Sequence, residues 1–63
     1  MKLNFYCDGQ NVDWIDNAEF VPREGEEIAL LDKHVYRVIN IRWVYDVATK
    51  RDRYAFVAVE KLA

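Results

Sequence analysis

Hydrophobic and polar residues alternate along this chain over short runs, with the period of β-strands rather than of helices. The first run covers Lys2–Trp14 and is interrupted by Asp8-Gly9. This dipeptide tolerates the positive φ angles that a two-residue hairpin turn requires. A turn here places the large apolar residues of the run, except Tyr6, on one face. The sequence therefore predicts a hairpin with the pairs Cys7–Gln10, Phe5–Val12 and Leu3–Trp14.

The middle of the chain predicts a short strand between two sets of turn residues. Pro22 fixes φ and cannot donate to a strand ladder, and Gly25 permits a tight turn. Asp16-Asn17 indicates either another turn or a short helical excursion. The elements expected here are the turn or helical excursion within Ile15–Phe20, a loop over Val21–Glu26, a strand over Glu27–Leu31 and a tight turn at Asp32-Lys33.

The longest predicted strand is Val35–Tyr45, and its alternation changes phase partway. Tyr36 and Val38 are apolar at even positions, whereas Ile41 and Trp43 are apolar at odd positions. A bulge near Ile39-Asn40 would switch the inward face and bend the strand around a barrel corner. A polar loop over Asp46–Asp52 and a last strand over Arg53–Leu62 complete the expected elements.

The cost of burying charge predicts which face of the last hairpin is inside. The apolar choice buries Ala55, Val57 and Val59 against Ile41 and Trp43. The opposite choice would bury the charge of Arg42 without a partner, which costs more free energy. Four candidate binding residues are then expected to share the outer face: Arg42, Val44, Tyr54 and Phe56.

Two interpretations of this outer group stay open. The aromatic rings could cover the sheet, stack on the Arg42 guanidinium and be half-buried by the N-terminal hairpin or by Ile15–Phe20. Alternatively, the group is a binding patch, because aromatic residues and arginine are enriched at protein interfaces. In that case Val44, Tyr54 and Phe56 could equally form a homodimer surface.

Composition places the chain among small globular domains. Its 63 residues form one expected domain, 1–63, and nine aromatic side chains supply apolar area for a small core. A lone Cys7 and the lack of a signal peptide favour the cytoplasm, and no apolar run is long enough to span a membrane. Residues 1–32 carry eight acids and two bases (−6), and residues 33–63 carry seven bases and three acids (+4). The two halves either neutralise each other or form a dipolar surface that steers a charged partner.

The residue inventory argues against catalysis. The chain has no serine, and it has single copies of threonine (Thr49), histidine (His34) and cysteine (Cys7). A Ser-His-Asp triad is therefore impossible, and a Cys-His pair would need an inward Cys7 to meet a turn residue. One His and one Cys cannot form a structural zinc site. The sequence predicts no enzyme, no cofactor, no metal and no small-molecule substrate.

Three motifs carry a resemblance: Val21-Pro22-x-x-Gly25-Glu26, Tyr36-x-Val38 and Ile41-x-Trp43. Together with the strand pattern they resemble SH3-like small β-barrels, and more narrowly small single-domain proteins of bacteria and their phages and plasmids. The resemblance implies an all-β fold, a small antiparallel SH3-like barrel of about five strands. Such barrels host peptide binding, nucleic-acid binding and assembly roles.

The expected function is a non-enzymatic protein-interaction module. The resemblance suggests a phage- or plasmid-type accessory or inhibitor protein, and the partner is another protein or a second copy of the chain. The alternative is a small nucleic-acid-binding barrel that uses the 42–56 hairpin, which carries the bases Arg42, Lys50, Arg51 and Arg53. A sequence pI near 5.2 weighs against that alternative, because domains that bind phosphates are usually basic.

Overall fold

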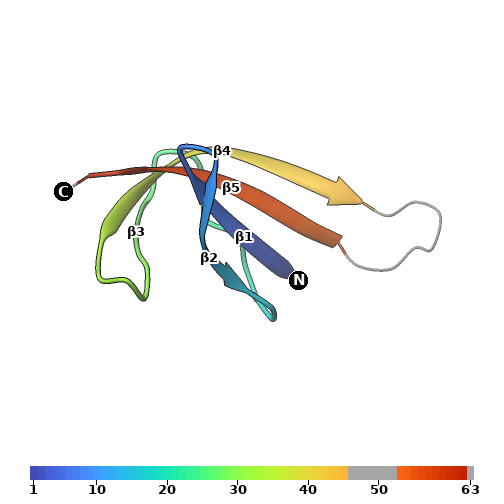
Figure 1. The fold of residues 1–63 in the computed structure, drawn as a ribbon. Helices are drawn as coiled ribbons and strands as arrows, with labels where there is room; N and C mark the ends of the chain where they lie inside the picture. Colours follow the sequence, from blue (N-terminus) through green and yellow to red (C-terminus); the bar gives the residue numbers. More distant parts are fainter. Residues whose placement is uncertain (46–52, 63) are drawn as a thin grey trace.

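A computed structural model describes residues 1–45 and 53–62, and these form one curled sheet of five strands (Figure 1). The order across the sheet is β2-β1-β5-β4-β3, so the sheet is a half-barrel with two edges. The described residues contain no helix, and the expected loop Asp46–Asp52 lies outside them. The all-β prediction of about five strands is confirmed. The strands are β1 (Lys2–Cys7), β2 (Gln10–Ile15), β3 (Glu27–Ala29), β4 (Val35–Tyr45) and β5 (Arg53–Lys61).

The sheet is mixed, because β1 and β5 run parallel to each other. Leu3 lies opposite Ala55 and Phe5 lies opposite Val57, so the inward residues of both strands form one apolar layer. The expectation of a purely antiparallel barrel is wrong at this pair. Hairpin signals report only strands joined by a short turn, whereas β1 and β5 stand near opposite ends of the chain.

The segment between β2 and β3 joins the two edges of the sheet. Ala18 and Val21 from this segment pack against the core, and the Ala18 amide donates to the Met1 carbonyl over 2.8 Å. The segment therefore helps to cover the concave side of the half-barrel. Residues 16–20 bend without forming a helix, so the helical alternative for this stretch is wrong.

The N-terminal hairpin has the predicted turn but a different register. Asp8 and Gly9 have φ angles of 53° and 78°, and Cys7 lies opposite Gln10 as predicted. A register shift between Phe5 and Tyr6 then inserts one extra residue into β2. The predicted pairs Phe5–Val12 and Leu3–Trp14 are therefore wrong. Phe5 lies opposite Asp13, Leu3 opposite Ile15, and Asn4 opposite a Trp14 that is 59% exposed.

The bulge predicted in β4 is confirmed. Val38 lies opposite Val59, Asn40 lies opposite Ala58, and the register shifts between them at Ile39. The loop before β3 binds the strand at the same point, because the Gly25 amide donates to the Val38 carbonyl over 2.8 Å. The extra residue reverses which positions face inward, as the phase change in the sequence indicated.

The core lies on the concave side of the sheet. Ala55, Val57 and Val59 are buried there, which confirms the inner face assigned to β5. Trp43 lies opposite Ala55 but is 43% exposed, so the predicted burial of Trp43 is wrong. Trp43 is exposed because it lies far from β3, which pairs only with the Val35–Arg37 end of β4. The buried cluster consists of Leu3, Phe5, Tyr36, Val38, Ala55, Val57 and Val59.

The turn between β3 and β4 is held by Asp32. Its carboxylate accepts hydrogen bonds from the His34 amide over 3.0 Å and from the Tyr36 hydroxyl over 2.6 Å. Lys33 has a φ of 68° and its amide donates to the Leu30 carbonyl over 2.9 Å. The predicted turn at Asp32-Lys33 is confirmed, but β3 ends at Ala29 rather than Leu31.

Candidate binding face

The candidate site is the side of the sheet opposite the buried cluster, here called the outer face. Strand alternation assigns it every second residue of the three central strands, and the registers align these residues in rows. One row crosses the sheet through Asn4, Phe56 and Arg42. The outer face comprises Lys2, Asn4 and Tyr6 from β1, Arg37, Asn40, Arg42 and Val44 from β4, and Tyr54, Phe56, Ala58 and Glu60 from β5.

The structure brings the four sequence-predicted binding residues together. Arg42 lies opposite Phe56, and Val44 lies opposite Tyr54 in the next row. The bulge at Ile39 produces this arrangement, since it turns the even positions of the second half of β4 outward. Without it, Arg42 would share the face of Val38 and point toward the core.

Three aromatic rings form a continuous contact on the outer face. The Tyr6 and Phe56 ring centroids are 5.2 Å apart with planes tilted by 59°. The Tyr54 and Phe56 centroids are 5.5 Å apart with planes at 86°, the edge-to-face arrangement that aromatic quadrupoles favour. All three rings are half-buried and lie outside the buried cluster. Tyr6 belongs to the N-terminal hairpin, so this hairpin contacts Phe56, as the covering interpretation expected.

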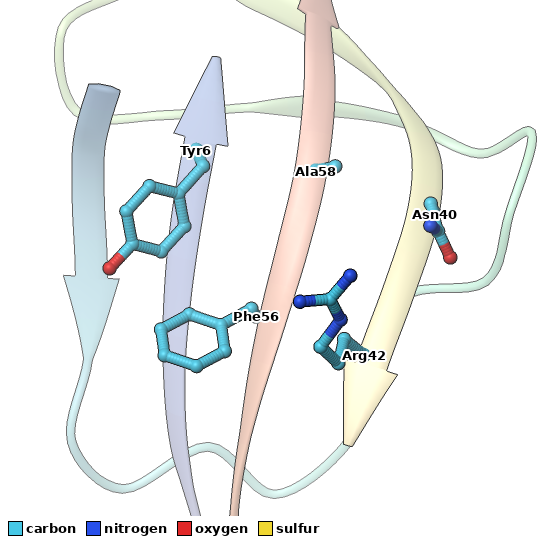
Figure 2. A pocket seen from close by; sticks show the side chains of 5 residues that line it. All are labelled: Tyr6, Asn40, Arg42, Phe56 and Ala58. Atoms are coloured by element: carbon cyan, nitrogen blue, oxygen red, sulfur yellow. The ribbon is translucent and has the colours of Figure 1, made fainter. Parts of the chain in front are cut away.

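A shallow hollow of about 280 Å³ lies beside these rings. Figure 2 shows the Phe56 ring below that of Tyr6, with the Arg42 guanidinium reaching from β4 toward β5 beside Phe56. The hollow thus combines aromatic and methyl surface with an amide and a guanidinium as donors. Its lining residues are Tyr6, Asn40, Arg42, Phe56 and Ala58.

Sequence reasoning found two of the five lining residues and missed the others. Arg42 and Phe56 line the hollow, whereas the predicted Val44 and Tyr54 lie on the same face outside its lining. Tyr6 was recognised as the apolar exception on the polar side of the first hairpin. Its place beside Phe56 depends on the parallel β1–β5 pairing, for which the sequence carries no local signal.

The outer face is cationic although the chain carries a net charge of −2. Its charged residues are the bases Lys2, Arg37 and Arg42 and one acid, Glu60, a balance of +2. Further along β5, Glu60 lies opposite Arg37 and forms an ion pair with it at 3.5 Å. The local charge of the face therefore differs in sign from that of the whole chain.

Cys7 and His34, the residues considered for catalysis, contact the core and its neighbouring turn. Cys7 is half-buried against the core, and the His34 ring lies edge-on to Tyr36 with centroids 6.4 Å apart. The hydrogen bond from Tyr36 lowers the pKa of Asp32, and the same bond raises the pKa of Tyr36 to about 12. This pairing anchors the β3–β4 turn to the core.

The described part of the chain has neither a metal-binding cluster nor a membrane-spanning helix. Among residues 1–45 and 53–62, no three His, Cys, Asp or Glu side chains gather as they would around a metal ion. The same residues contain no helix of the length and apolar character needed to cross a membrane. Comparison of the chain with protein-family models, curated proteins and solved structures finds no match.

Proposed function

We propose that this chain is a non-enzymatic protein-interaction module that binds its partner on the outer face. The observation that carries the proposal is the contact of Tyr6, Phe56 and Tyr54 beside Arg42 on one side of the sheet. Tyrosine and arginine are among the residue types most enriched in the energetically dominant parts of protein interfaces. The three rings are also placed by two hydrogen-bonded strands, β1 and β5, so binding would cost little conformational entropy.

The hollow indicates what the partner would present. Phe56, Tyr6 and Ala58 offer apolar surface, and Arg42 and Asn40 offer hydrogen-bond donors at its side. An apolar side chain next to a carboxylate or a backbone carbonyl satisfies both kinds of surface. The proposed partner segment therefore inserts an apolar residue beside Phe56 and pairs an acceptor with Arg42.

The proposal also includes the type of fold, a small SH3-like barrel. The β3-β4-β5 meander and the bulged β4 support a small barrel of the SH3-like type. The parallel β1–β5 pair is a departure from the antiparallel pattern expected for it. An accessory or inhibitor role of the phage or plasmid kind rests on the sequence resemblance alone.

Partner capture by matched double variants tests the proposal. Tagged wild-type chain and the variant Arg42→Gln with Phe56→Leu are compared in extracts of the source cells. The control is Phe20→Leu with Leu31→Gln, which alters side chains that are 81% and 90% exposed but lie outside the outer face. The outer-face variant is expected to lose at least about 90% of a partner that the control retains. Equal capture by both variants, with circular dichroism unchanged, would contradict the proposal.

A single-stranded nucleic acid is the second candidate ligand, and the excess of bases on the outer face favours it, because its one carboxylate, Glu60, is paired with Arg37. Adjacent aromatic rings on an open sheet can stack bases, and Lys2 and Arg42 can contact phosphates. The acidic composition of the whole chain does not describe this face. The test is fluorescence polarisation with a labelled single-stranded oligonucleotide at increasing salt.

Two phosphate contacts predict a slope of about −1.4 for log affinity against log salt, and Arg42→Gln should reduce its magnitude by about 0.7. Phe56→Leu should weaken binding without changing the slope, because stacking releases no counterions. An oligonucleotide that does not bind even at low salt would exclude this candidate.

A further inference from the structure

The free edge of β4 is a second place where the described chain can bind a ligand. On one side β4 pairs with β5 from Tyr36 to Tyr45, but on the other side it pairs with β3 only over Val35–Arg37. Among the described residues no strand lies beside the remaining part, 39–45, on that side. Figure 1 shows β4 extending well past β3 toward the far end of the sheet. Such an edge presents backbone donors and acceptors to an added strand.

The hydrogen-bond pattern identifies which backbone groups point to this edge. The Val38 amide and carbonyl bond to Glu26 and Gly25, so the backbone of Val38 faces the β3 side of the strand. The bulge adds one residue, after which alternation directs Asn40 and Arg42 toward β5. The backbone groups of Ile41 therefore face the edge, and the side chains of Asn40 and Arg42 flank them on the outer face.

The side chains at this edge differ from those that usually protect one. The stretch 39–45 contains no proline, lysine or acid, and it is rich in β-branched and aromatic residues, as Ile39 at 51% exposure illustrates. The opposite edge, β2, carries Asp13 opposite the buried Phe5, and a charged side chain on the inward face of an edge strand discourages strand addition. The two edges of the half-barrel are therefore not equivalent.

We infer that the free edge of β4 binds an extended segment of a partner protein as an added antiparallel strand, with a carboxylate beside Arg42. Asn40 and Arg42 both donate hydrogen bonds, and a carboxylate is the side chain that only accepts them. A second copy of this chain would instead bring two Arg42 side chains to one edge, and like charges on paired strands oppose pairing. An acidic segment is therefore the occupant that fits.

This inference rests on the proposed function and deepens it, because the added strand would run along the rim of the hollow. Side chains alternate along a strand, so the residues of the segment on the outer face would lie next to Asn40 and Arg42. There the residue opposite Arg42 can present its carboxylate and the residue opposite Asn40 can extend an apolar side chain toward the hollow, while the backbone of the residue between them bonds to Ile41. Backbone bonds would supply affinity and the hollow would supply specificity.

Peptide titration followed by amide NMR shifts tests the inference. The probe is a blocked seven-residue peptide of alternating valine and glutamate. Its controls are the valine–lysine peptide and the glutamate peptide with N-methyl groups on the edge-facing amides. The glutamate peptide is expected to shift the Ile41 amide, and either control should bind at least about tenfold more weakly. Equal shifts by all three peptides, or none by the first, would overturn the inference.

A charge exchange provides the second measurement. Arg42→Glu should reverse the preference in favour of the lysine peptide, whereas Lys2→Glu should not, because Lys2 lies on β1 two strand spacings from β4. A concentration-dependent dimer in which the Ile41 amide becomes protected from exchange would instead identify a second copy as the occupant. If the glutamate peptide does not shift the Ile41 amide but partner capture still depends on Phe56, this inference is overturned and the proposed function stands.

Discussion

At the scale of single residues, Lys33 occupies a backbone conformation that its side chain disfavours. Its φ of 68° lies in the left-handed region at the end of the turn between Leu30 and His34, where the Leu30 amide donates to the His34 carbonyl. Turns of this kind usually place glycine there. The chain tolerates a lysine because the Leu30 carbonyl accepts the Lys33 amide and Asp32 binds both the turn and Tyr36.

Lys33→Gly should therefore stabilise the protein. Removing the Cβ relieves the left-handed strain, and the greater freedom of glycine in the unfolded chain offsets part of the gain. The free energy of unfolding is expected to rise by roughly 0.5 to 1 kcal/mol. Urea denaturation measures it, with Lys33→Ala as the control that retains the strain. A destabilised glycine variant would show that Lys33 contributes through its side chain.

The Tyr36–Asp32 hydrogen bond should make stability depend on pH at both extremes. Tyr36 has a folded pKa of about 12 against a usual value of 10.0, so its contribution is complete below pH 10 and is lost as the pH rises toward 12. Asp32 has a lowered pKa, so its contribution is present above pH 3.8 and is lost as the pH falls further.

Tyr36→Phe removes this hydrogen bond and keeps the ring. The variant should be less stable than the wild type at neutral pH, and its unfolding midpoint should change less between pH 10 and 12. Thermal unfolding monitored by circular dichroism across this range measures the difference. Parallel curves for the two proteins would contradict the assigned role of the bond.

At the scale of elements, sequence reasoning succeeded where a local signal exists. Asp8-Gly9 identified the first turn, and the phase change between Val38 and Ile41 identified the bulge in β4. The cost of burying Arg42 assigned the faces of β5 correctly. Sequence reasoning failed to predict the partner of Trp14. A turn determines only the pairs next to it, and the bulge near Phe5 lies further along the hairpin.

The alternation of β5 predicts opposite consequences for two neighbouring substitutions. Val57 is fully buried, so Val57→Ala should lower the free energy of unfolding by roughly 2 kcal/mol through lost apolar burial and a cavity. Phe56 lies outside the buried cluster, and Phe56→Leu keeps most of its apolar area, so it should cost less than about 1 kcal/mol. Urea denaturation of both variants decides the order. A larger loss for Phe56→Leu would place the outer face in the core.

At the scale of the whole molecule, the open form of the sheet shapes the candidate site. The parallel pairing of β1 with β5 joins two hairpin units and brings Tyr6 against Phe56. No nearest-neighbour pattern predicts that contact, and for this reason the sequence located Arg42 and Phe56 but not the hollow between them. The same open form leaves most of β4, among the described residues, without a neighbouring strand on the side away from β5. Both proposed binding surfaces therefore depend on the fold as a whole.

The most direct test of the central claim is site-specific photocrosslinking in the source cells. A photoreactive phenylalanine analogue is placed at position 56, and at positions 20 and 31 as controls, where the native side chains are 81% and 90% exposed. If the outer face binds a partner protein, position 56 gives one discrete crosslinked product that disappears with Arg42→Gln, and the two more exposed positions do not. Crosslinking that follows exposure, strongest at positions 20 and 31 and unaffected by Arg42→Gln, would contradict the claim.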